Sequence, residues 1–225
     1  MRKLTLLLFA VALVAAGSCN KDHRTLKPEE LEEGQLWEGS PYWASANIGA
    51  DNPWDYGLYF SWGNIIGYAP VDGTFSYSFD KNSYSSPGGS KLSGNIPANE
   101  EYDAAQANLG GKWRMPTKDE LKALMDNCDK EWFDGETKKY YEKPVAGMLF
   151  RGRGEYSGNG IFLPAAGGGG FIALYNEGAG YYWSSTLDTS SEENSQADML
   201  TFYSGRPVMS TEARIAGFPI RPVSQ

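Results

Sequence analysis

Apolar and polar positions repeat with two different periods along this chain, and the two periods predict where helices and strands lie. Four apolar residues recur at helical spacing and predict a helix with one apolar face: Leu121, Leu124, Met125 and Cys128. Thr117 and Glu120, three residues apart, predict a capping box that begins this helix. Residues 103–108 predict a second, shorter helix, which ends at Gly110.

The remaining patterned segments are aromatic or β-branched, short, and bounded by Gly, Pro, Asn or Asp, which is typical of strands. Such strands are predicted within YWASANIGA, YGLYFSWG, GMLFRG, GIFLPAAG, YYWSSTL, DMLTFYSG and FPIRPV. Residues 66–97 lack sustained periodicity and predict a long loop. Gly167 to Gly170 predict a flexible hairpin turn, and Arg151 to Gly154 predict a turn that exposes both of its arginines. Two helices in mid-chain between groups of strands indicate the α+β class.

The first residues differ in character from the rest and predict export. Arg2 and Lys3 precede an apolar core at residues 4–16, which is too short to cross a bilayer, and small residues follow it. The run VAAGSC resembles a bacterial lipobox and predicts that Cys19 is lipidated, although an ordinary cleaved signal remains the alternative. The predicted organisation is a lipoprotein signal peptide at 1–18, a lipidated Cys19 with a flexible tether at 19–35, and one domain at 36–225. We therefore expect an exported protein, lipid-anchored to the outer membrane, with exposure at the cell surface as a further expectation.

The charge of the chain restricts its partners. The formal net charge is −8, and removal of Arg2 and Lys3 changes it to −10. An acidic chain without a basic run is not expected to bind nucleic acid or to dock electrostatically on anionic lipid. With Cys19 lipidated, Cys128 has no partner for an intrachain disulfide, and its place on an apolar helix face predicts a buried, unreactive thiol.

The side chains that most enzymes use are scarce in the domain. The one histidine, His23, lies in the tether, so the domain lacks a Ser-His-Asp or Cys-His arrangement, and a single Cys cannot build a zinc site. We expect no metal and no other cofactor. Acidic pairs such as Asp51 with Asp55, and Glu192 with Glu193, leave a polysaccharide hydrolase as an alternative, but solvated loop carboxylates are the simpler interpretation.

Two arginines stand in apolar stretches that end in proline, and we expect both to be structural. Arg114 lies in KWRMP, and Arg221 lies in GFPIRPV. An arginine among large apolar residues either points outward or is paired. We predict that each guanidinium bonds backbone carbonyls of a neighbouring loop.

Seven segments in this order resemble the Fibrobacter succinogenes major paralogous domain family: YWASANIGA, YGLYFSWG, LGGKWRMPTKDEL, IFLPAAG, GYYWSS, LTFYSG and GFPIRPV. The resemblance covers about residues 36–223. It implies a C-type lectin-like fold, in which the first and last strands pair, two helices flank them, and a second small sheet carries the ligand face. Variable adhesins of diversity-generating retroelements and formylglycine-generating enzymes share this fold. The calcium signatures of lectins are missing, and the cysteine pair of the formylglycine-generating enzymes is reduced to one residue.

The resemblance implies a calcium-independent, non-catalytic domain that binds an extracellular protein or glycan. It places the ligand face in the last third of the domain, where the expected ligand-binding residues are Tyr175, Tyr181, Tyr203, Arg206 and Met209. Period-2 alternation puts Leu200 and Phe202 in the core and Thr201 and Tyr203 on the outer face. A structural or accessory component of a surface appendage or complex is the alternative function.

Overall fold

The computed structural model describes residues 34–79, 92–98, 101–190 and 194–225. The predicted signal peptide, Cys19 and nearly all of the predicted tether lie outside these residues. Within the described ranges, no helix is both long enough and apolar enough to span a membrane.

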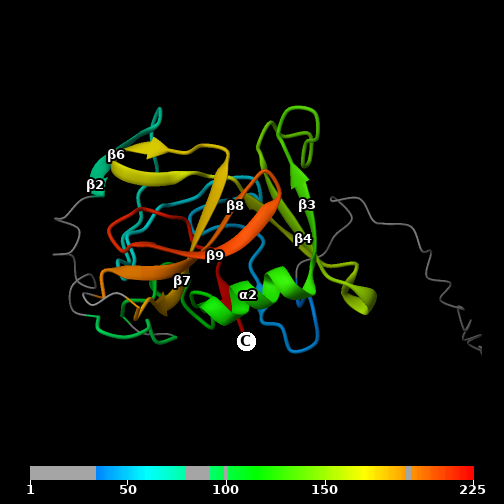
Figure 1. The fold of residues 1–225 in the computed structure, drawn as a ribbon, viewed down its shortest axis with the longest axis horizontal. Helices are drawn as coiled ribbons and strands as arrows, with labels where there is room; N and C mark the ends of the chain where they lie inside the picture. The colour runs from blue at the N-terminus through cyan, green and yellow to red at the C-terminus, as the bar shows by residue number, and fades with distance from the viewer. Residues whose placement is uncertain (1–33, 80–91, 99–100, 191–193) are drawn as a thin grey trace, which may run out of the picture.

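Four small antiparallel sheets and two α-helices make up the part of the chain that the structure describes, which confirms the α+β class. The two-stranded sheets pair β1 (Tyr42–Trp43) with β10 (Val223–Ser224), and β2 (Thr74–Phe79) with β6 (Gly168–Tyr175). One three-stranded sheet contains β3 (Asp129–Phe133), β4 (Gly147–Arg151) and β5 (Gly160–Pro164). The other contains β7 (Ala179–Leu187), β8 (Gln196–Tyr203) and β9 (Arg206–Ala213). Figure 1 shows β2 and β6 at one end of the long axis, and the β3–β4 hairpin toward the other.

Both predicted helices are present, and each begins with a side-chain cap, of which the one at Thr117 was predicted. In α1 (Ala104–Leu109), the Asp103 carboxylate accepts hydrogen bonds from two backbone amides of the first turn. In α2 (Lys118–Asn127), Thr117 and Glu120 form both halves of the capping box. A 3-10 turn, η3 (Gly154–Tyr156), adds a helical turn that the sequence pattern did not predict. Cys128 follows α2 as a fully buried free thiol whose pKa burial raises to about 12, as expected for an unreactive cysteine.

The main hydrophobic core lies between α2 and one face of the β7–β8–β9 sheet. Leu121 and Leu124 of α2 belong to the same buried cluster as Tyr182, Leu200 and Phe202 of the sheet. A second cluster gathers around Trp62, Trp183 and Phe218. The predicted core positions Trp183, Leu200 and Phe202 are at most 1% exposed, so the alternation in β8 is confirmed.

The chain closes on itself where its first and last described strands pair. Trp43 of β1 lies opposite Val223 of β10, as the family resemblance implied. On its other side, Val223 exchanges two backbone hydrogen bonds with Arg114, at 2.9 and 3.0 Å. The segment that begins α2 is therefore joined directly to the end of the chain.

Arg221 is fully buried and connects segments that are distant in sequence. Its guanidinium donates to the carbonyl oxygens of Ser45, at 2.7 Å, and Phe162, at 2.8 Å, and to Asn47 Oδ1, at 2.9 Å. Asn47 Nδ2 in turn donates to the Tyr56 carbonyl and to Tyr182 Oη. The prediction that this arginine bonds backbone carbonyls is confirmed, and the bonds tie β1, β5 and β7 to the last strand.

Several predicted loops and strands were wrong in detail. Gly168, Gly169 and Gly170 do not form a turn but begin β6, and Phe79 packs where a Cβ on Gly169 would lie, 2.7 Å away. Arg151 is not exposed in a turn; it is buried at the end of β4, and Arg153 alone points to solvent. The first two aromatic segments contain only β1 and isolated bridges, and the predicted 66–97 loop contains β2.

Replacement of Arg221 tests the structural role of its guanidinium. Arg221→Ala should lower the free energy of unfolding by about 3–5 kcal/mol, because several buried acceptors lose their donor. The melting temperature should fall by roughly 10 °C for a domain of this size. Arg206→Ala is the matched control, since it removes the same side chain from an exposed position, where a substitution usually changes stability by about 0.5 kcal/mol or less. Equal melting temperatures for the two variants would contradict the structural assignment.

Candidate functional site

The β7–β8–β9 sheet presents two faces, and strand pairing decides which residues share each face. Residues directly opposite one another in antiparallel strands project to the same side. Tyr181 of β7 pairs with Thr201 of β8, which pairs with Val208 of β9. One row further along, Tyr203 pairs with Arg206. The side that does not pack against α2 therefore carries these five residues, here called the tyrosine face.

The outer part of the tyrosine face is open to solvent. Tyr203 is 70% exposed, Val208 is 52% exposed, and Arg206 is also exposed. They flank a two-residue turn at Ser204–Gly205, in which both residues have positive φ, and such turns hold a hairpin in a fixed register. Large side chains on a rigid hairpin lose little entropy when they bind a partner.

Tyr175 and Tyr181 are partly buried at the inner edge of the tyrosine face and add little to its exposed part. Tyr181 stacks on Phe218 with a centroid separation of 5.1 Å, and its hydroxyl accepts a hydrogen bond from Asn176. Tyr175 lies 6.2 Å from Tyr181, and burial, together with the charge of Glu212, raises its pKa. Both rings pack against the second core cluster, so they are partly buried anchors at the inner edge of the face.

Met209 does not belong to this face, contrary to the sequence-based expectation. It pairs with Leu200 and packs against the main cluster beneath the sheet. Its neighbour Val208 takes the outward position, because alternation along β9 starts at Arg206. The alternation in RPVMS places Val208 outward and Met209 inward, but only when the register of the hairpin is known.

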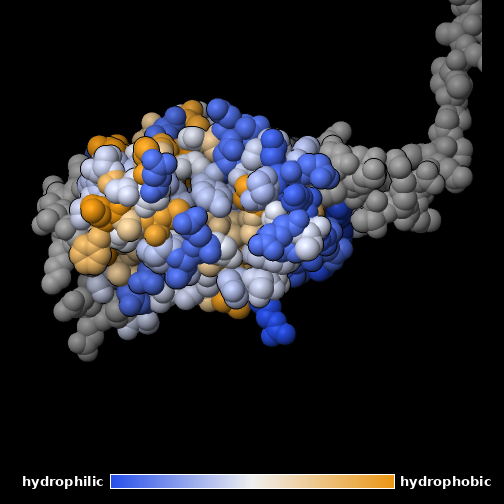
Figure 2. Space-filling view, turned by 90° about the horizontal axis from the view of Figure 1, so that it is seen from above, coloured by the Kyte–Doolittle hydropathy of each residue, from blue (hydrophilic) through white to orange (hydrophobic). Residues whose placement is uncertain are grey.

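A second group of exposed apolar side chains lies on and beside β6. Phe171 is 73% exposed, Ile172 is 54% exposed, and Val71 is 74% exposed next to β2; we call these three residues the β6 strip. Figure 2 shows hydrophobic side chains gathered at the end that carries β2 and β6, and hydrophilic ones over the opposite half. The sequence analysis did not predict this strip, because it interpreted the preceding glycine run as a turn and not as part of a strand.

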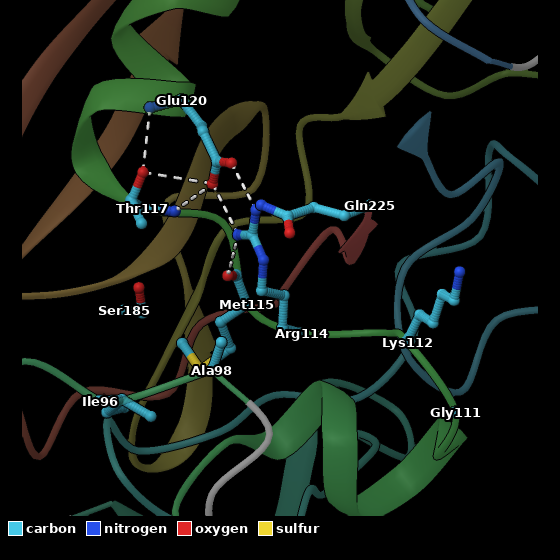
Figure 3. A pocket seen from close by; sticks show the side chains of 10 residues that line it. All are labelled: Ile96, Ala98, Gly111, Lys112, Arg114, Met115, Thr117, Glu120, Ser185 and Gln225. Atoms are coloured by element: carbon cyan, nitrogen blue, oxygen red, sulfur yellow. Dashed lines mark hydrogen bonds and ion pairs between the residues drawn. The ribbon is translucent and has the colours of Figure 1, made fainter. Parts of the chain in front are cut away.

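A cavity of about 690 Å³ lies beside the start of α2 (Figure 3). Arg114 donates to both carboxylate oxygens of Glu120, at 2.6 and 2.8 Å, and to the Met115 carbonyl. Glu120 also accepts from the Thr117 amide. The main partner of Arg114 is therefore the Glu120 carboxylate rather than the predicted loop carbonyls. The two paired charges line the cavity and connect α2 to the end of the chain.

Of the carboxylates considered for hydrolysis, Asp51 is exposed on a loop and Asp55 is bound within its own turn. Asp55 Oδ2 accepts from the backbone amide and side-chain amide of Asn52, at 3.0 and 2.8 Å, and holds its own turn. Glu192 and Glu193 lie outside the described residues. Among the described residues, no three His, Cys, Asp or Glu side chains gather closely enough to hold a metal ion.

Comparison of this chain with protein-family models, with curated proteins and with solved structures finds no match. The candidate site is therefore assigned from its geometry. Five exposed apolar side chains belong to the tyrosine face and the β6 strip, and the ring contact of Tyr175 with Tyr181, at 6.2 Å, joins the inner edges of the two surfaces.

The ion pair between Arg114 and Glu120 predicts that the folded domain loses stability in acid. Burial works to raise the pKa of Glu120, but hydrogen bonds from Arg114 and Thr117 outweigh it, so the pKa lies below its ordinary value of 4.5. A carboxyl with a lowered folded-state pKa stabilises the fold above its unfolded-state pKa and loses this contribution as the pH falls. The free energy of unfolding should decrease from about pH 5 to pH 3.

Urea titrations at several pH values measure this effect. Glu120→Gln should flatten the decrease in that range, whereas Asp119→Asn, which removes an exposed carboxylate from the same helical turn, should leave it in place. A Glu120→Gln variant with the wild-type pH profile would show that the ion pair does not stabilise the fold.

Proposed function

We propose that this chain is an exported lipoprotein whose C-type lectin-like domain binds an extracellular ligand without catalysis. The tyrosine face and the β6 strip together form the proposed binding surface, and a protein is the ligand that this surface fits best. The observation that carries the proposal is the set of exposed Phe, Ile, Val and Tyr side chains on these two surfaces, whose inner edges meet where Tyr175 contacts Tyr181. Exposed apolar patches of this kind, bordered by polar residues, mark interaction sites.

The C-type lectin-like assignment has support from topology. The first and last strands pair, α2 packs on a three-stranded sheet, and the proposed surface belongs to strands late in the chain. These features agree with the arrangement that the family resemblance implies.

The position of the attachment end supports a tethered binding domain. The described chain starts beside Asn159, whose side-chain amide donates to the Gln35 carbonyl at 2.7 Å. Residues 153–159 lie toward one end of the long axis, and β2 and β6 lie at the other (Figure 1). A domain anchored through Cys19 would present the β6 strip away from its point of attachment.

The same surface also fits the alternative of an accessory component in a permanent complex, since obligate interfaces are apolar. Such a component would co-purify with one partner in fixed proportion. A binding domain would instead release its partner on dilution.

Lipidation of Cys19 is tested by metabolic labelling. Radiolabelled palmitate should enter the wild-type chain and should not enter Cys19→Ala, because the substitution removes the thiol on which the lipid anchor would be built. Equal labelling of the two chains would exclude the proposed anchor.

The binding surface is tested with arrays of extracellular proteins and of glycans. The triple variant Tyr203→Ala, Arg206→Ala, Val208→Ala should bind the partner found on the array at least about tenfold more weakly, or about 1.4 kcal/mol. Its melting temperature should change little, because these side chains are exposed. Phe171→Asn should also weaken binding, and asparagine suits the positive φ of that position.

Leu109→Ser is the matched control, because it removes an exposed apolar side chain at the end of α1. It should bind as the wild type does. Unchanged binding by the triple variant, or equal loss in the control, would place the ligand elsewhere.

A further inference from the structure

Strand β9 forms one edge of the β7–β8–β9 sheet, and neighbouring segments bond to the opposite edge. On β7, the Trp183 amide donates to the Pro219 carbonyl at 3.3 Å, and the Ser185 amide donates to the Pro116 carbonyl at 2.8 Å. The Ser185 carbonyl also accepts from the Ile96 amide, at 2.8 Å. Within the described ranges, β9 pairs with β8 and with no further strand. The sheet therefore has one covered edge and one unpaired edge.

The register of the β8–β9 hairpin decides which backbone groups of β9 point away from β8. Ser204 and Gly205 form a two-residue turn, so the flanking Tyr203 and Arg206 are a hydrogen-bonded pair. Hydrogen-bonded and non-hydrogen-bonded pairs alternate along an antiparallel ladder. The even-numbered residues of β9 therefore direct their backbone groups to β8, and the odd-numbered ones direct them outward. The amide of residue 213 agrees, because it donates to the Glu212 side chain, at 2.9 Å, and not to β8.

The outward backbone groups of residues 207–211 have no partner in the described chain. They are the carbonyls of Pro207, Met209 and Thr211 and the amides of Met209 and Thr211. All three residues are partly exposed. A row of unpaired groups is a template for another strand, and proteins usually protect it with lysine, proline or a covering segment. The eight residues of β9 include no lysine, and their one proline stands second, so most of the edge is able to pair.

The side chains of the tyrosine face stand where an added strand would approach them most closely. Arg206, Val208 and Ser210 direct their backbone groups to β8, so each would form a non-hydrogen-bonded pair with a residue of the added strand. The Cα atoms of such a pair are about 4.5 Å apart, and their side chains interact directly. Arg206 is exposed and has no ion pair with another described residue, and Glu212 carries the opposite charge near the other end of β9.

We propose that β9 receives an extended segment of the protein partner as a fourth strand of this sheet. The inference rests on the proposed function and specifies how the partner binds beside the tyrosine face. Antiparallel addition is favoured, because antiparallel pairing is the more stable per residue. The charges at the two ends of the edge select a segment with an acidic residue opposite Arg206, a β-branched residue opposite Val208 and a basic residue opposite Glu212.

The backbone of such a segment would satisfy the outward groups of β9. The residues opposite Met209 and Thr211 would each exchange two hydrogen bonds with them, and the residue opposite Pro207 would donate one. Main-chain hydrogen bonds supply affinity in this mode of recognition, and alternate side chains supply specificity.

Calorimetric titration of the full chain with two end-blocked heptapeptides tests the proposal. In the antiparallel register, acetyl-KTTVITE-amide places its lysine opposite Glu212, its isoleucine opposite Val208 and its glutamate opposite Arg206. The peptide acetyl-ETIVTTK-amide has the same composition in reverse order and opposes like charges in that register. The wild type should bind KTTVITE at least about tenfold more tightly than ETIVTTK.

Substitution of Thr211 by proline tests whether the edge itself forms the contact. Thr211→Pro removes an outward amide and no bond to β8, and proline is tolerated on an edge strand at such a position. It should weaken KTTVITE binding at least about tenfold and leave the melting temperature within a few degrees of the wild type. Thr211→Val is the matched control, because it also loses the hydroxyl that bonds Gln196 but keeps the amide. It should bind KTTVITE as the wild type does.

A charge exchange at the exposed Arg206 tests the register without affecting the backbone. Arg206→Glu should bind KTTVITE more weakly than the wild type and should bind acetyl-KTTVITK-amide more tightly than the wild type does, because the last residue of the peptide lies opposite position 206. An unchanged preference in this variant would contradict the proposed register.

Three results would overturn strand addition at β9. They are no binding of KTTVITE to the wild type at millimolar concentration, equal binding of the two reversed peptides, and equal binding by Thr211→Pro and Thr211→Val. A chain that sediments as a dimer, which Thr211→Pro converts to a monomer, would show instead that a second copy occupies the edge. If the array partner slows exchange at residues 203–208 but KTTVITE does not bind, the proposed function stands and strand addition fails.

Discussion

The buried guanidinium of Arg221 is the interaction on which the rest of the structure depends. It reaches backbone carbonyls of residues 44–45 and of Phe162, and Asn47 extends its hydrogen bonds to Tyr182, whose hydroxyl donates to the Pro164 carbonyl at 2.7 Å. A buried charge is tolerated only where its donors are matched by acceptors, so the surrounding loops must adopt one arrangement. These bonds connect three of the four small sheets: the β1–β10 pair, the β3–β4–β5 sheet and, through Asn47, the β7–β8–β9 sheet.

A frame fixed in this way can support side chains that project from it into solvent. Phe171 is 73% exposed and has a positive φ, and it lies in β6, which rests on the buried rings of β2. The free energy of the core offsets the local strain, typically about 1–3 kcal/mol for such a residue. This residue belongs to the surface for which we propose a ligand, whereas the charged cavity beside α2 joins the helix to the chain end.

Local sequence signals predicted the parts of the fold that local interactions determine. The capping box at Thr117, the short helix that ends before Gly110 and the alternation of Leu200 and Phe202 depend on neighbouring residues and were confirmed. Strand register and packing between distant segments determine the rest. Gly169 enters a strand because the distant Phe79 fills the space beside it, and Met209 turns inward because the hairpin at Ser204 sets the phase of β9. The contact of Trp54 with Tyr141 joins residues far apart in sequence, so no local pattern indicated it.

The central claim is that a rigid frame presents the tyrosine face and the β6 strip to a protein partner. Amide hydrogen exchange of the full chain, with and without the partner identified on the protein array, tests it most directly because it locates the contact without any substitution. We expect slower exchange on partner binding at residues 171–175 and 203–208. Slower exchange at residues 96–98 and 111–120 around the cavity, with β6 and the β8–β9 hairpin unchanged, would contradict the account.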